Sequence, residues 1–155
     1  MKIVEYSSNR GKEIADLFYE SVHSIDSSIY SEQQKHAWAP MPIDYINWEI
    51  RLENKKPYVL LIKNEVAGFI ELESDGHIDC AYVLPKFQRK GVATNLLNYV
   101  KLVATGLGLR QLYVEASIVA KPLFEKNGFL VENKNQVSIN NMVLVNYSMR
   151  MAMQP

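Results

Sequence analysis

The sequence has a single cysteine, Cys80, and no hydrophobic run long enough to cross a membrane. One cysteine excludes an internal disulfide bond, which fits a reducing cytoplasm. Because Cys80 lies within an apolar stretch, we expect a buried small hydrophobe and not a nucleophile. A membrane helix needs about 20 consecutive apolar residues, and residues 1–5 lack the apolar core of a signal peptide. We therefore expect a cytoplasmic protein without membrane contact.

An excess of charge of one sign is also absent, since 17 basic residues balance 17 acidic ones. Sequence-independent binding to nucleic acid needs an excess of Lys and Arg, so we expect no nucleic-acid partner. Metal-ligand spacing is lacking too, because His23 and His36 have no partner at a suitable separation and no Cys/His cluster exists. The sequence therefore predicts no metal site.

The length of 155 residues is usual for one domain, and the composition, 48% hydrophobic and 22% charged, is ordinary for a globular protein. No repeat, low-complexity tract or long linker divides the chain. We therefore predict a single domain over residues 1–155.

The N-terminal third reads as one strand followed by helical segments. Ile3 to Tyr6 is typical of a short strand, and apolar residues recur at helical spacing from Lys12 onward. Ser31 followed by Gln34 is a capping-box signature for a short helix through Trp38. Asp44 can cap a third helical segment.

The rest of the chain alternates between strands and helices. Three strands form a meander, with a hairpin turn at Asp75-Gly76. A helix beginning near Val92 then leads to another strand, a short helix and two final strands. The predicted strands are 58–63, 66–74, 77–83, 111–116, 129–132 and 142–151, and the short helix is 122–127. This order predicts an α/β fold of the α+β type, with a mixed sheet and a crossover helix between two parallel strands.

The most informative stretch joins the strand that ends near Leu84 to the helix that begins near Val92. Gly91 allows a tight turn, and successive backbone N–H groups at the start of the helix would point at one spot. The pattern lacks the Gly-Lys-Ser/Thr of a Walker A loop and the three glycines of a dinucleotide loop. A basic turn with one glycine is common, but this one suits a pyrophosphate. The loop residues are Gln88, Arg89, Lys90, Gly91, Val92, Ala93 and Thr94.

The pattern Gln/Arg-x-x-Gly-x-Gly/Ala after a strand resembles the acetyl-CoA loop of the GNAT superfamily of N-acetyltransferases. A second segment, Phe124-Glu125-Lys126-Asn127-Gly128-Phe129, is similar to the family's Tyr-Glu-Lys-x-Gly-Phe, one strand later, and Tyr82 to Pro85 resembles its strand end before the loop. Residues 30–40 resemble a largely uncharacterised bacterial subgroup. The resemblance covers almost the whole chain and implies a central mixed sheet that splays between strands 4 and 5, with helices on both faces.

The resemblance also implies how acetyl-CoA binds. The fourth strand is expected to bulge near Tyr82-Val83, and the pantetheine arm to lie in the wedge between strands. A backbone N–H near Val83 would polarise the thioester carbonyl, and Gln88 to Thr94 would hold the pyrophosphate. Ser117 stands where the family often has Asn on the pantetheine arm. Phe124 stands where it often has the Tyr that protonates the leaving thiolate.

Candidate acid–base groups lie on the strands beside this wedge. Amines with a pKa near ~10 must lose a proton to react. Asp79 is the first candidate base, although it could also sit on an exposed face or hold a helix end. His77 shares its face but could be exposed at the turn. Glu73 and Glu71 could hold a cationic amine or lie on a solvated face. The Glu115 side chain could point away from the acceptor.

Aromatic residues gather where the acceptor pocket should be roofed. Tyr30 and Trp38 are the ones that we expect to reach a substrate, by stacking or by cation–π contact with an amine. Tyr45 and Trp48 fall on apolar helix faces, where core packing is the simpler interpretation.

The sequence as a whole predicts an N-acetyltransferase that transfers the acetyl group of acetyl-CoA directly to a primary amine of a small molecule or peptide. Phe124 favours an alternative, a non-catalytic acyl-CoA sensor or interaction module. An unrelated nucleotide-binding module is a third possibility, which the segment around Phe124 argues against. The oligomeric state is open between a monomer and a homodimer.

Overall fold

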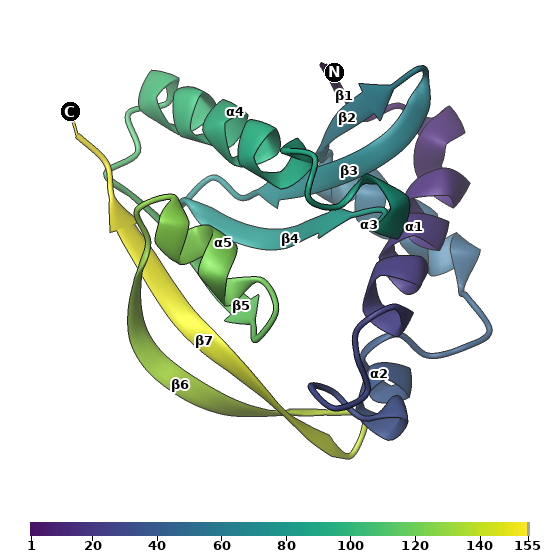
Figure 1. The fold of residues 1–155 in the computed structure, drawn as a ribbon. Coiled ribbons are helices and arrows are strands. Elements are labelled where there is room, and N and C mark those ends of the chain that lie inside the picture. Colours follow the sequence, from purple (N-terminus) through teal and green to yellow (C-terminus); the bar gives the residue numbers. More distant parts are fainter. Residues whose placement is uncertain (155) are drawn as a thin grey trace.

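The computed structural model describes residues 1–154, which form one seven-stranded sheet with helices on both faces (Figure 1). The strand order across the sheet is β1-β2-β3-β4-β5-β7-β6, and only β4 and β5 are parallel. The strands are β1 (Lys2–Glu5), β2 (Tyr58–Ile62), β3 (Glu65–Leu72), β4 (His77–Val83), β5 (Gln111–Ser117), β6 (Leu130–Ile139) and β7 (Met142–Ala152). The helices are α1 (Gly11–His23), α2 (Glu32–Trp38), α3 (Tyr45–Lys55), α4 (Val92–Gly106) and α5 (Lys121–Lys126). The predicted mixed sheet with a crossover helix is confirmed.

Side chains of the central strands alternate between two hydrophobic cores. Val59 and Phe69 pack with α1 and α3, whereas Leu60 and Ile70 pack with α4 and α5. Helix α4 approaches β3 closely at Gly68, where an added Cβ would lie 2.9 Å from a methyl carbon of Val92. The two cores fix α4 on one face and the N-terminal helices on the other, so that each face of β4 meets a different helix layer.

The N-terminal helices begin where the sequence places their caps. The Gln34 N–H donates to the Ser31 hydroxyl (3.1 Å), and the Ser31 N–H donates to the Gln34 side chain (2.8 Å). Asp44 accepts from the Asn47 N–H at 3.1 Å and starts α3. These contacts confirm both predicted caps. None of the helices among residues 1–154 is long and apolar enough to span a membrane.

The hairpin of β6 and β7 is longer than predicted. The sequence predicted a strand over residues 129–132, whereas β6 runs from Leu130 to Ile139. Most of β6 is exposed, so it lacks the apolar alternation by which a half-buried strand is recognised. The hairpin turns at Asn140 and Asn141, both with positive φ, as a two-residue turn requires.

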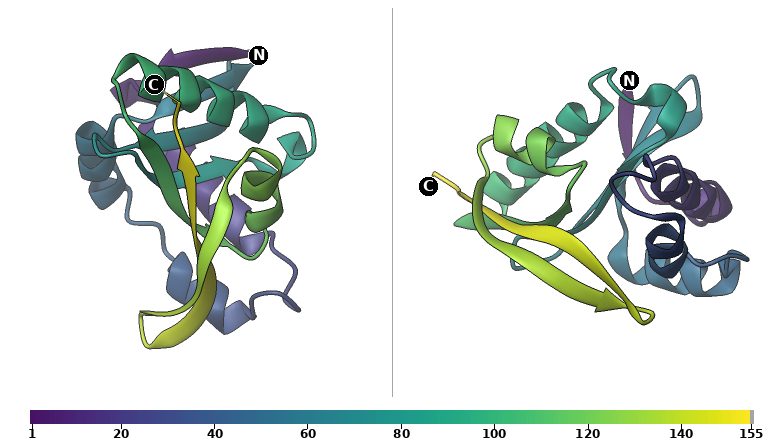
Figure 2. Two further views of the ribbon diagram at one scale, coloured as in Figure 1. Left: turned by 90° about the vertical axis from the view of Figure 1, so that its left-hand side faces the viewer. Right: turned by 60° about the horizontal axis from the view of Figure 1, so that its bottom comes forward.

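The tip of this hairpin reaches across to α2 (Figures 1 and 2). The Asn140 side chain donates to the Ala37 carbonyl at 2.8 Å, and the Gln34 side chain donates to the Val143 carbonyl at 2.9 Å. The Tyr30 hydroxyl donates to the Val145 carbonyl at 2.5 Å. These contacts hold the β6–β7 hairpin against α2 and the segment that precedes it.

The parallel ladder between β4 and β5 is only two rungs long. His77 pairs with Tyr113 and Ile78 with Val114, after which the strands separate. Strand β5 continues against β7 as far as Ser117 opposite Asn146. We call this divergence beyond Ile78 and Val114 the fork; it is the splay that the sequence predicted between strands 4 and 5.

The bulge that opens the fork lies earlier than predicted. Strand β3 advances two residues from Ile70 to Leu72 while β4 advances three from Ile78 to Ala81, so the extra residue lies at Asp79-Cys80. Tyr82 and Val83, the predicted bulge, are in regular register with β3, and that prediction is wrong. A bulge bends its strand and increases the local twist. Here it directly follows the last rung shared with β5, which accounts for the separation.

The bulge also changes which side chains face the N-terminal helices. Ile78 and Ala81 both pack toward α4, whereas Cys80 and Tyr82 pack toward α1 and α3. Simple alternation would place Asp79 on the face opposite Tyr82. Because of the extra residue, Asp79 lies on the same side as Tyr82.

Candidate active site

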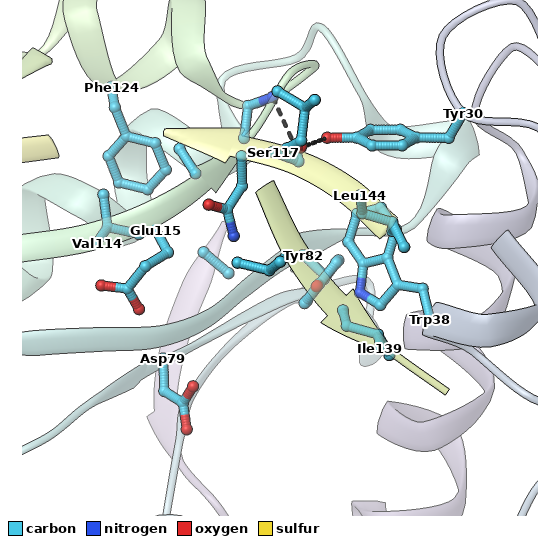
Figure 3. A pocket seen from close by; sticks show the side chains of 16 residues that line it. Tyr30, Trp38, Asp79, Tyr82, Val114, Glu115, Ser117, Phe124, Ile139 and Leu144 are labelled. Carbon is cyan, nitrogen blue, oxygen red and sulfur yellow. Dashed lines mark hydrogen bonds between the residues drawn. The ribbon is translucent and has the colours of Figure 1, made fainter. Parts of the chain in front are cut away.

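A pocket of about 280 Å³ lies at the fork (Figure 3). Its wall includes side chains from β4, β5, α2 and α5, and the β6–β7 hairpin completes it. Six of the residues predicted for the site line it: Tyr30, Trp38, Asp79, Tyr82, Ser117 and Phe124. We call it the fork pocket.

A second cavity of about 310 Å³ lies at the start of α4. All of the predicted loop residues except Lys90 line it. Gly91 has a φ of 83°, a left-handed conformation that suits glycine, and it precedes the first helical turn. The first bond of α4 runs from the Asn95 N–H to the Gly91 carbonyl, so the N–H groups of Val92, Ala93 and Thr94 have no backbone acceptor among residues 1–154. We call this cavity the loop cradle.

The loop cradle suits an anion on two counts. Free N–H groups at a helix start carry partial positive charge. Cationic side chains lie at the wall, where Arg89 is joined by Lys126 from the end of α5. Lys90 instead points toward the ring of Phe87, 5.9 Å from its centroid. No role was predicted for Lys126 from the sequence, because its position beside the loop depends on the packing of α5.

A narrow cavity of about 30 Å³ lies between the two sites. It shares Ala81, Tyr82, Ala120 and Phe124 with the fork pocket, and Val83, Ala93 and Leu123 with the loop cradle. The wall is thus continuous from the start of α4 to the fork. An extended ligand with an anionic end fits this arrangement.

The exposed edge of β4 offers a backbone donor along this route. The Leu84 N–H donates to the Ala67 carbonyl on β3 at 2.8 Å. Because successive residues of a strand direct their backbone groups to opposite edges, the Val83 N–H faces the fork. The β5 ladder has already ended at Ile78. The Val83 N–H thus lies on the edge from which the predicted donor would act.

Ser117 and Phe124 line the fork pocket from the β5 and α5 side. The Ser117 hydroxyl accepts from the Ala120 N–H at 3.1 Å and helps the turn into α5. Phe124 is buried and packs edge-to-face on Phe129, with centroids 5.1 Å apart. No proton donor is therefore present on that side chain.

A charged cluster lies on the floor of the fork, on the face covered by α3. It consists of Arg51, Lys55, Glu71, Glu73, His77, Asp79 and Glu115. Arg51 holds the fully buried Glu71 by two hydrogen bonds, at 2.6 and 3.2 Å. Both Arg51 (3.0 Å) and Lys55 (2.8 Å) contact the same oxygen of Asp79. Glu71 therefore positions Arg51 and does not reach the fork pocket, unlike the substrate contact predicted for it.

Burial alone would raise the pKa of Asp79, but the hydrogen bond with Lys55 and the charge of Arg51 outweigh it. The pKa of Asp79 consequently lies below its ordinary value. Its other oxygen, Oδ1, has no partner among residues 1–154. Asp79 is an ionised carboxylate at neutral pH, with one oxygen free to bind a cation.

His77 lies between two carboxylates. Nδ1 is 2.5 Å from Glu73 Oε1, and Nε2 is 2.7 Å from Glu115 Oε1. The ring also stacks on Tyr113, with centroids 4.8 Å apart. Burial would lower the pKa of His77, but the bonds to Glu73 and Glu115 outweigh it and the pKa is raised. Two carboxylate acceptors are satisfied together only by the doubly protonated ring.

Glu115 contributes a second carboxylate to the fork. The sequence left open whether its side chain points away from the acceptor, and in the structure it lines the fork pocket. Ile78 and Val114 form the last rung, so Asp79 and Glu115 are the first residues beyond it on either strand. Glu115 Oε2, like Asp79 Oδ1, has no partner among residues 1–154.

Cys80 is not a nucleophile candidate. Burial raises the pKa of its thiol well above the ordinary value, so the thiol stays protonated. Arg51 also donates to its sulfur at 3.1 Å. Cys80 packs against the core on the α1 and α3 side but is only half-buried, so the buried small hydrophobe predicted from the sequence is right in its packing and wrong in its degree of burial.

The opposite wall of the fork pocket is aromatic (Figure 3). Tyr30 packs edge-to-face on Trp38 with centroids 5.4 Å apart, and Trp38 lies 6.3 Å from the ring of Tyr82. The Tyr30 hydroxyl is occupied, since it also accepts from the Ile118 N–H at 2.9 Å. The pocket is therefore carboxylate-lined at the fork and aromatic toward α2.

Comparison with known proteins agrees with this geometry. Residues 26–151 match the family described as the acetyltransferase (GNAT) domain. The chain is 32% identical over 150 residues to YafP of Escherichia coli (strain K12), an uncharacterised N-acetyltransferase, covering 97% of this chain and 95% of that protein.

Solved structures share the fold. A GCN5-related N-acetyltransferase from Rhodopseudomonas palustris superposes with a TM-score of 0.92 at 29% identity, covering 97% of this chain and 94% of the other. PaiA N-acetyltransferase from Thermoplasma acidophilum, in complex with coenzyme A, gives a TM-score of 0.77 at 18% identity, covering 97% and 98%. Salmonella typhimurium YncA, a putative acetyltransferase solved with acetyl-CoA, gives 0.74 at 16% identity, covering 100% and 95%. The chain therefore belongs to the GNAT family and is an acetyl-CoA-dependent N-acetyltransferase.

Proposed function

We propose that this enzyme acetylates the primary amine of a small molecule or peptide directly, with acetyl-CoA and the amine bound at the same time. The observation that carries the proposal is the continuous wall from the loop cradle to the fork pocket. An anion site lies at one end, and two carboxylates suited to an amine lie at the other. Cys80 supplies no thiolate for a covalent intermediate.

The residues present fit acetyl-CoA. The unpartnered N–H groups of Val92 to Thr94, with Arg89 and Lys126, would hold the pyrophosphate. The edge of β4 at Val83 and the Ser117 hydroxyl would hold the pantetheine arm. When bound, acetyl-CoA supplies an activated thioester; transfer forms the amide C–N bond, breaks the C–S bond and releases coenzyme A and a proton. The Val83 N–H would polarise the carbonyl.

The carboxylates at the fork bind and orient the amine. An alkyl amine arrives as an ammonium ion at neutral pH, and Asp79 Oδ1 and Glu115 Oε2 are free to accept its N–H groups. Because the pKa of Asp79 is low, Asp79 is a better cation site than a base. We infer that Asp79 orients the ammonium ion so that the proton it loses passes to water. Glu115, His77 and Glu73 would line the route of that proton to solvent. Close positioning of the two reactants supplies the main rate contribution.

Phe124 removes one usual acid from this reaction. A side chain without a hydroxyl cannot protonate the leaving thiolate, so water is its proton source in this scheme. Phe124 favours the alternative of a non-catalytic acyl-CoA-binding module. The carboxylates kept at the fork argue for catalysis, because a sensor has no need of an amine site there.

Calorimetric titration with acetyl-CoA tests the proposal first. We expect micromolar binding to acetyl-CoA and much weaker binding to ATP, followed by release of free coenzyme A only when a primary amine is added. Binding without amine-dependent release would favour the sensor. Failure to bind millimolar acetyl-CoA would refute the assignment of the loop cradle.

We also propose a cellular location and an oligomeric state for the enzyme. A lone protonated thiol at Cys80 suits a reducing cytoplasm, where we place the protein. We expect the enzyme to work as a monomer or homodimer, with no nucleic-acid or membrane partner, and gel filtration of the purified chain distinguishes the two states.

A further inference from the structure

The fork pocket differs in charge from one end to the other. Asp79 and Glu115 line it, and its wall contains no Lys, Arg or His among residues 1–154. The cations of the charged cluster lie behind these carboxylates, on α3 and at the start of β4. An acceptor in the pocket therefore meets the carboxylate oxygens first.

The charged cluster does not neutralise itself. Its four carboxylates outnumber Arg51, Lys55 and His77, leaving a net charge of −1 even when His77 is protonated. Arg51 is committed to the buried Glu71. The two oxygens without partners, Asp79 Oδ1 and Glu115 Oε2, belong to the residues that line the pocket. The fork thus retains a site for one cation.

The body of the acceptor faces a different surface. Trp38, Tyr82 and Tyr30 form the aromatic part of the wall, and Ile139 and Leu144 of the hairpin add aliphatic area. The Tyr30 hydroxyl is already hydrogen-bonded, so a ligand would contact the ring of Tyr30 and not its hydroxyl. A flat apolar group suits such a surface, because aromatic rings gain by stacking or edge contacts. The enclosed space of about 280 Å³ suits a small acceptor group.

We propose that the acceptor is a small arylalkylamine, a primary ammonium group on a short chain that ends in an aromatic ring, without a carboxylate. The ammonium binds between Asp79 and Glu115, and the ring lies against Trp38 and Tyr82. An amino acid with the same ring is rejected, because its carboxylate would face two carboxylates with no cation at the wall to offset them. This inference rests on the proposed N-acetyltransferase function and narrows its substrate class.

Matched amines test this selectivity. The purified chain with acetyl-CoA would be assayed for coenzyme A release and N-acetyl product, using 2-phenylethylamine against phenylalanine and tryptamine against tryptophan. We expect kcat/KM at least about 100-fold higher for each amine than for its amino acid, as expected for an unfavourable contact between like charges. Propylamine, which has the ammonium but no ring, should be at least about tenfold poorer than 2-phenylethylamine.

Two variants separate the charge effect from the ring effect. Glu115→Gln should reduce the ratio of 2-phenylethylamine to phenylalanine at least about tenfold, because one repulsive carboxylate is gone. Trp38→Ala should raise KM for 2-phenylethylamine at least about tenfold and leave that for propylamine unchanged. Unchanged acetyl-CoA affinity in both variants shows that the fold is intact.

The outcomes separate the two levels of the argument. Equal rates for amines and amino acids, or turnover only of aliphatic polyamines or peptides, would overturn the arylalkylamine assignment while the acetyltransferase remains. Acetyl-CoA binding with no turnover of any amine would overturn the proposed function, and this inference with it.

Discussion

The loop cradle and the charged cluster lie at opposite ends of one ligand channel and are built in different ways. The cradle is made by a run of consecutive residues, and its main donors are backbone N–H groups of Val92 to Thr94. The charged cluster takes side chains from α3, from β3 and the turn after it, and from β4 and β5. A backbone site tolerates many side chains, whereas a side-chain site depends on each partner in turn.

Gly91→Asp should have the largest effect on this comparison, at the cradle. It places a carboxylate where a pyrophosphate should lie and strains a residue with a φ of 83°. We expect acetyl-CoA affinity to fall at least about 1000-fold, or ~4 kcal/mol. Calorimetry would measure it, with Gly106→Asp at the far end of α4 as the matched control, since an added Cβ there meets nothing within 4 Å. Unchanged affinity in Gly91→Asp would exclude the cradle as the phosphate site.

Arg51→Met should be the most damaging change in the charged cluster. It leaves Glu71 fully buried without its cation, which we expect to lower the free energy of unfolding by about 3 kcal/mol. The double variant Arg51→Met, Glu71→Leu should recover most of that loss, because no buried charge remains. Urea denaturation measures both. If the single variant is as stable as the wild type, the pair has no structural role.

Lys126→Met tests whether Lys126 helps the loop cradle to bind acetyl-CoA. Lys126 lines it and Lys90 does not, so removing Lys126 should weaken acetyl-CoA binding about fivefold, or ~1 kcal/mol. Lys90→Met carries the same loss of charge and should change the affinity less than about twofold. The opposite order would show that Lys90 contacts the phosphates.

The pH dependence of stability should show the smallest effect. The raised pKa of His77 means that the folded state holds the proton more tightly than the unfolded state. This stabilisation is complete below the ordinary pKa of about 6.5 and is lost as the pH rises through the folded value. Relative to His77→Gln, the wild type should therefore lose stability in that interval, as followed by denaturation at a series of pH values. Glu73, Glu115, Asp79 and Tyr113 are the ionisable groups around the ring.

The difference between the two regions also explains what the sequence could predict. The cradle was predicted because Gln88 to Thr94 are contiguous and their geometry follows from one glycine and one helix start. Lys126 and Arg51 were missed because no local pattern records a partner far along the chain. The full length of β6 was missed because it is exposed and therefore polar.

Glu115 and the bulge illustrate the same limit at the fork. Strict alternation along β4 separates Asp79 from Tyr82, and only the extra residue at Asp79-Cys80 brings them to one face. No local sequence pattern indicates that β4 has an extra residue at this point. The orientation of Glu115 depends in turn on the register of the short ladder between β4 and β5.

The bulge has a consequence for redesigning the enzyme. Before it, odd-numbered residues of β4 face the N-terminal helices, and after it even-numbered residues do. His77 and Asp79 therefore belong to the charged cluster beneath the fork, whereas Ala81 and Val83 line the narrow cavity toward the loop cradle. Deleting the extra residue would restore strict alternation along β4 and turn Asp79 to the face opposite Tyr82, away from Lys55 and Arg51.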